Sequence, residues 1–192
     1  MSWLAVILCY IIGSFPTAYI AGQRLKGKDI RQMGDGNMGA RNAYWELGRS
    51  IGILIFIIDA AKGSLSIMLA IALHLPESLV LLCGLAAVAG HNWPLFLHFR
   101  GGRGESTTIG ILFVLIPKTM ALSAGLGLIS LLVWKNVLLT SAVIFISQPI
   151  ISWWLKVPAS LLGYGILLPV IVGLTHSLQW RETTFNTRRG NT

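Results

Sequence analysis

The sequence has 192 residues, of which 54% are hydrophobic and only 11% are charged, and its mean hydropathy is +0.71. This composition excludes an ordinary soluble domain and is typical of a protein that crosses a membrane several times. The net charge is +8, but basic residues in a membrane protein reflect topology and anionic lipid, and no nucleic-acid-binding motif accompanies them.

Hydropathy predicts apolar spans, each bounded by polar, glycine or proline residues, over 3–22, 51–73, 79–96, 106–116, 119–134, 137–155 and 159–176. The fourth span is too short to cross about 30 Å of hydrocarbon upright. Pro117 interrupts what would otherwise be one helix over 106–134, so six spans are an alternative to seven. The whole chain, 1–192, is expected to form a single all-α transmembrane domain.

The distribution of basic residues favours seven spans, with the N-terminus outside and the C-terminus in the cytoplasm. This arrangement places twelve Lys and Arg residues on the cytoplasmic side, whereas only Lys118 and Lys156 fall on the other side. A six-span arrangement would put the basic C-terminal tail outside, against the positive-inside tendency. The two polar loops, 23–50 and 97–107, then both face the cytoplasm.

Both cytoplasmic loops combine glycine with basic residues. The first contains GDGNMGARN (34–42), and the second contains FRGGRGEST (99–107). Glycine lets backbone N–H groups approach an anion closely, and Arg adds charge and directed hydrogen bonds. Two such loops at a membrane surface indicate a phosphorylated substrate.

A few polar residues lie within or at the ends of the spans. Ser14 precedes Pro16, which is expected to kink the first span. Asp59 and Lys62 share one helical face, and either a structural ion pair or a role in the substrate site would explain them. His91 ends the third span, where a general base, a phosphate donor and a capping residue are all open readings.

No nucleophilic triad and no metal-ligand spacing is readable, so neither a metal nor another cofactor is expected. Chemistry suited to the remaining residues would use a substrate that is already activated. Positioning and charge neutralisation would then supply most of the catalysis.

Five motifs together resemble the bacterial PlsY family of acyl-phosphate:glycerol-3-phosphate acyltransferases, and their order and spacing also match. They are GSFPTAY (13–19), DIRQMGDGNMGARN (29–42), DAAKG (59–63), GHNWPLF (90–96) and FRGGRG (99–104). The resemblance implies a seven-helix enzyme in the bacterial plasma membrane, with its site facing the cytoplasm. It also implies that glycerol 3-phosphate attacks an acyl phosphate, releasing phosphate and lysophosphatidic acid, with membrane lipids as surroundings.

The resemblance, taken position by position, assigns candidate site residues. His91 and Lys62 are the candidate catalytic residues. The candidate substrate- and phosphate-binding residues are Ser14, Arg31, Gly34, Gly36, Asn37, Gly39, Arg41, Asn42, Gly101, Gly102, Arg103, Gly104 and Arg181.

Several positions depart from the family pattern. Asp35 stands where Ser is usual, Trp45 where a basic residue is usual, and Glu105 where a small apolar residue is usual. Arg41 is hypothesised to replace the charge missing at position 45 and to neutralise Asp35. These departures support an alternative, a non-catalytic relative that acts as a lipid-binding scaffold or as a subunit of a membrane complex. A transporter is a third reading, but the inverted repeat it predicts is not visible.

Overall fold

The computed structural model describes the backbone of residues 2–189 and the side chains of residues 2–178, and all regular structure within this part is helical. The all-α prediction is therefore confirmed. The elements in chain order are α1 (Ser2–Gly13), α2 (Thr17–Lys26), η1 (Ile30–Gln32), α3 (Ala40–Glu46), α4 (Arg49–Ala72), α5 (Glu77–Asn92), η2 (Leu95–Leu97), α6 (Glu105–Leu115), α7 (Pro117–Trp134), α8 (Val137–Trp154) and α9 (Ala159–Arg189).

Six helical segments of the described chain are long and apolar enough to cross a membrane. They are Ser2–Lys26, Arg49–Ala72, Glu77–Leu97, Pro117–Trp134, Val137–Trp154 and Ala159–Leu178. The remaining apolar helix, α6, has only 11 residues. It is separate from α7 because the backbone of Ile116, which lies between them, is not helical. The chain is thus a multi-pass membrane protein, while seven crossings and the sidedness of the termini remain predictions that depend on α6.

The predicted first span is in fact two helices. The break between α1 and α2 lies at residues 14–16, where Pro16 cannot donate a backbone hydrogen bond. The kink expected from the sequence is therefore a complete interruption. This interruption places polar backbone groups inside the bundle, next to α4.

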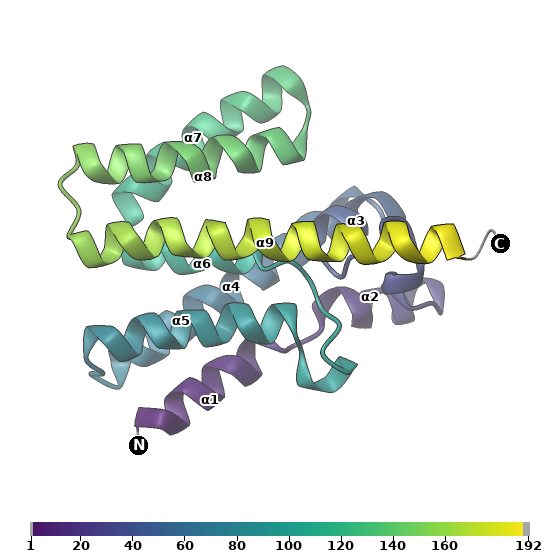
Figure 1. The fold of residues 1–192 in the computed structure, drawn as a ribbon, viewed down its shortest axis with the longest axis horizontal. Helices are drawn as coiled ribbons and strands as arrows, with labels where there is room; N and C mark the ends of the chain where they lie inside the picture. The colour runs from purple at the N-terminus through teal and green to yellow at the C-terminus, as the bar shows by residue number, and fades with distance from the viewer. Residues whose placement is uncertain (1, 190–192) are drawn as a thin grey trace.

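Helix α4 is central and packs along α6, while α1 packs along α5 (Figure 1). Glycines at the crossings allow this close approach, because a Cβ at Gly63 would overlap the Thr107 carbonyl and one at Gly110 would overlap the Ala60 carbonyl. Helices α7 and α8 form a pair at one side of the bundle (Figure 1). Both glycine loops lie at the end from which α2 and α3 project, opposite the start of α1.

Candidate active site

A buried ion pair in α4 lies beside the interruption of the first span. Lys62 Nζ is 2.7 Å from Asp59 Oδ1 and donates to the Phe15 carbonyl at 2.9 Å. The Thr17 hydroxyl donates to the same Asp59 oxygen at 3.0 Å. Both charged side chains are thus partnered, as charges inside a membrane must be. The structure thus contains the ion pair that was one of the two interpretations of these residues. The other interpretation, a role in the substrate site, also applies to Lys62, because it has one more neighbour.

That neighbour is His91, the next-to-last residue of α5. Lys62 Nζ lies 3.5 Å from His91 Nδ1, and an ammonium group can only donate. His91 Nδ1 must therefore accept, which leaves the ring proton on Nε2. The side chain is buried but reaches the pocket described below. The ring of His91 thus lines the pocket with its proton on Nε2.

The second glycine loop is pressed against the end of α5. Gly101 N–H donates to the Asn92 carbonyl and Gly102 N–H to the His91 carbonyl, each at 3.0 Å. A Cβ at Gly101 would overlap the His91 carbonyl, and one at Gly102 would overlap His91 Nε2. Position 101 therefore requires glycine for the loop to approach the backbone of α5, and position 102 requires glycine for the imidazole to keep its place.

We expect Gly102→Ala to reduce turnover by about 100-fold, because the added methyl group displaces the His91 ring by about an ångström. The protein should still accumulate, since the loop lies at the end of the bundle. Turnover per folded protein, measured beside the thermal unfolding temperature, tests this. Gly125→Ala, where a Cβ meets nothing within 4 Å, is the matched control. Wild-type turnover by Gly102→Ala would rule out the close packing of ring and loop.

The first glycine loop is organised by Asn42. Its amide nitrogen donates to the carbonyls of Ile30, Met33 and Asn37 at 2.9–3.2 Å, and its Oδ1 accepts from Asp35 N–H at 3.2 Å. Gly34 and Gly36 adopt left-handed conformations on either side of Asp35. Asn42 thus shapes the loop from inside and is not directed at the pocket.

Arg31 joins the two glycine loops. Its guanidinium is bound by the Asp29 carboxylate, at 2.6 Å for the shortest contact, and donates to the Leu97 and Arg100 carbonyls. It also lies over the Tyr19 ring. Despite partial burial, the Arg31 contact lowers the pKa of the Asp29 carboxyl below its usual value. Arg31 is therefore committed to protein contacts and holds the loops together.

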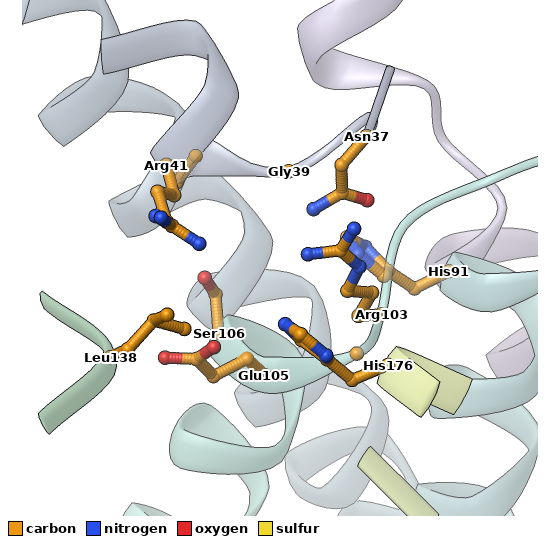
Figure 2. A pocket seen from close by; sticks show the side chains of 11 residues that line it. Asn37, Gly39, Arg41, His91, Arg103, Glu105, Ser106, Leu138 and His176 are labelled. Carbon is orange, nitrogen blue, oxygen red and sulfur yellow. The ribbon is translucent and has the colours of Figure 1, made fainter. Parts of the chain in front are cut away.

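An open pocket lies where the two loops meet α6, α8 and α9. Its lining consists of Asn37, Gly39, Ala40, Arg41, His91, Arg103, Gly104, Glu105, Ser106, Leu138 and His176. Arg41, Arg103 and His176 point into it from three different segments (Figure 2). Such a set of convergent cationic and polar donors is suited to a phosphate group.

The amino end of α6 forms the floor of this pocket. Gly104 is the N-cap residue in a left-handed conformation, and no side chain caps the helix. The first-turn N–H groups of α6 therefore add partial positive charge beside Arg103. Burial lowers the pKa of the Arg103 guanidinium, and Asp35, 3.6 Å from Nη1, opposes this shift. Glu105 accepts a hydrogen bond from Ser141 of α8.

The sequence matches the family described as Glycerol-3-phosphate acyltransferase over residues 3–185. The chain belongs to this family. Glycerol-3-phosphate acyltransferase 4 of Dehalococcoides mccartyi is 48% identical, with 95% of this chain and 98% of the relative covered. Glycerol-3-phosphate acyltransferase 1 of Moorella thermoacetica is 36% identical, with 92% of each covered.

Solved structures agree with this membership. The crystal structure of PlsY, an integral membrane glycerol 3-phosphate acyltransferase, in its glycerol 3-phosphate form matches with a TM-score of 0.83 and 29% identity, covering 98% of this chain and 92% of that one. The lysophosphatidic acid form matches with a TM-score of 0.78 and 28% identity. The resemblance inferred from the five motifs is therefore confirmed.

Within this acyltransferase, the structure gathers part of the predicted site. Asn37, Gly39, Arg41, His91, Arg103 and Gly104 line the pocket. Other predicted residues lie behind the lining and support it, namely Arg31, Gly34, Gly36, Asn42, Lys62, Gly101 and Gly102. Ser14 donates to the Tyr10 carbonyl one turn earlier and is not part of the lining. The side chain of Arg181 lies outside the described residues, so its assignment stays a prediction.

Sequence reasoning missed His176 as a pocket residue. It assigned Arg181 of the C-terminal tail to the substrate and did not include His176 in the site. The available signal was its position, a titratable side chain near the end of the last apolar span and on the same side as both glycine loops. Its distance along the chain from Arg103 concealed their proximity.

Proposed function

We propose that this protein transfers a fatty acyl group from an acyl phosphate to glycerol 3-phosphate in the bacterial plasma membrane, forming lysophosphatidic acid and phosphate. One observation carries the proposal: Arg41, Arg103 and His176 converge on a pocket at the uncapped amino end of α6. The names of the relatives supply the acceptor and the acyl transfer. The choice of acyl phosphate as donor rests on the motif resemblance and on the chemistry of the pocket.

An acyl phosphate is a mixed anhydride, so the reaction needs no protein nucleophile. The acceptor hydroxyl oxygen forms the new ester bond to the acyl carbon, and the bond between that carbon and the phosphate oxygen breaks. The hydroxyl proton leaves with the released phosphate. Negative charge develops on the acyl oxygen and on the leaving phosphate, where the α6 amino end stabilises it, while Arg103 holds the phosphate of glycerol 3-phosphate.

In this scheme Lys62 acts on the substrate through His91. Since Nδ1 of His91 accepts from Lys62, its Nε2–H is available as a donor to an oxygen of the substrate. Lys62, which is buried and does not line the pocket, positions the ring and fixes its tautomer. We therefore assign His91 as a hydrogen-bond donor and Lys62 as a positioning residue.

The test is an assay of the purified protein in lipid nanodiscs with radiolabelled glycerol 3-phosphate and either palmitoyl phosphate or palmitoyl-CoA. We expect a labelled lysophosphatidic acid with the acyl phosphate only. Product from the CoA thioester alone would overturn the donor assignment and leave the acyl transfer intact. No product from either donor, with an active relative as control, would favour the non-catalytic alternative, which the names of the relatives do not support.

A further inference from the structure

The Asp35 carboxylate faces a cationic group of the pocket. Asp35 Oδ2 lies 3.6 Å from Nη1 of Arg103, whose residue is only 8% exposed. Arg103 comes from the second glycine loop and Asp35 from the first, so their contact joins the two loops beside the pocket. Arg103 points into the pocket (Figure 2), so the Asp35 carboxylate is placed against a guanidinium that lines the pocket.

The loop holds Asp35 firmly in this position. The Asn37 N–H donates to Asp35 Oδ1 at 3.0 Å, which turns the other carboxylate oxygen towards Arg103. Asn42 accepts from the Asp35 N–H, and glycines with positive φ stand on either side, at 34 and 36. The carboxylate therefore cannot leave Arg103 by a simple side-chain rotation without losing the hydrogen bond from Asn37.

We propose that Asp35 acts as a built-in competitor for Arg103, serving as its counter-ion before the substrate binds and weakening the binding of the substrate phosphate. The inference rests on the proposed function in taking Arg103 as a phosphate ligand. A bound phosphate would replace Asp35 as the counter-ion of Arg103 and would bring like charges close together. Asp35 thus sets the affinity for phosphorylated substrates, and the acceptor binds only when its concentration is high.

A purely structural reading of Asp35 makes the opposite prediction. If the carboxylate serves to orient Arg103 for the substrate, its removal should weaken phosphate binding. If it acts as a competitor, its removal should tighten binding. The removal of one like charge at this range corresponds to about tenfold in the dissociation constant, about 1.4 kcal/mol.

The decisive variant is Asp35→Asn, which keeps an oxygen to accept from the Asn37 N–H and removes the charge. Isothermal titration of inorganic phosphate and of glycerol 3-phosphate into the protein in nanodiscs should show Kd lower by about tenfold. Glu77→Gln, which removes a carboxylate at the opposite end of the bundle, should leave Kd unchanged. An unchanged or raised Kd for Asp35→Asn overturns the proposal; Asp35→Ser serves as a second neutral variant if Asp35→Asn does not accumulate.

A double variant tests whether Asp35 competes with the phosphate at Arg103. In an Arg103→Gln background, Asp35→Asn should no longer tighten phosphate binding, because the shared partner is gone. Equal tightening in both backgrounds would show a general charge effect and reject competition at Arg103. In the turnover assay, Asp35→Asn should lower KM for the acceptor with kcat within about twofold. Since phosphate binding is measured without turnover, an inactive wild type would reject the proposed function without deciding this inference.

Discussion

Arg103→Gln is expected to lower kcat/KM for glycerol 3-phosphate by about 1,000-fold, about 4 kcal/mol. The guanidinium is largely buried, faces the pocket and lies beside the first turn of α6. Glutamine keeps hydrogen-bond donors but loses the charge and the bidentate geometry that a phosphate oxygen pair requires. Steady-state kinetics with varied acceptor concentration measures the effect.

The matched control is Arg100→Gln, three residues earlier in the same loop. The Arg100 side chain is exposed and does not line the pocket, so kcat/KM should stay within about twofold of the wild type. The thermal unfolding temperature of both variants separates lost binding from lost structure. A reduction below about tenfold for a folded Arg103→Gln protein would place the substrate phosphate elsewhere.

The second large effect is expected for Lys62→Met, which should destabilise the protein by about 3–5 kcal/mol. Asp59 would become an unpartnered carboxylate inside the bundle, with only the Thr17 hydroxyl left to bind it. The Phe15 carbonyl would lose its ammonium donor as well. We expect poor accumulation in the membrane, a lowered thermal unfolding temperature, and turnover reduced by about 100-fold or more.

A double variant, Asp59→Asn with Lys62→Met, separates stability from catalysis. The amide introduced at position 59 would still accept a hydrogen bond from Thr17 without bringing a buried charge, so most of the stability should return. Turnover should stay low, because His91 Nδ1 has lost the donor that fixes its tautomer. Wild-type turnover by a stable double variant would show that Lys62 serves the fold alone.

The helical framework could be predicted from the sequence because hydropathy and charge act over whole spans. The predicted apolar segments 51–73, 106–116, 119–134 and 137–155 correspond closely to α4, α6, α7 and α8, whereas α5 ends at Asn92, before the predicted 96, and α9 continues past the predicted 176 to Arg189. The separation of α1 from α2 could not be predicted, since Pro16 is compatible with either a kink or a break. A tertiary contact favours the break, because Lys62 donates to the Phe15 carbonyl within the interruption.

The site was less predictable, because sequence patterns do not fix where a side chain in a glycine loop points. Asn42 and Arg41 are neighbours in the same motif, yet Asn42 binds three backbone carbonyls whereas Arg41 faces the pocket. Asp35 likewise pairs with Arg103 of the other loop, a contact that the hypothesis of neutralisation by Arg41 did not include. Contacts between segments so far apart along the chain depend on the helix crossings, which no local pattern contains.

The shortness of α6 has a consequence for where the two substrates can meet. Its 11 residues extend for about 16 Å, roughly half the thickness of the hydrocarbon layer, while α4 beside it is long enough to cross completely. Because the pocket is built on the amino end of α6, we expect it to lie deeper in the membrane than the ends of the neighbouring helices on the same side. A water-soluble phosphate would descend to this depth, and an acyl carbonyl would reach it without its chain leaving the lipid.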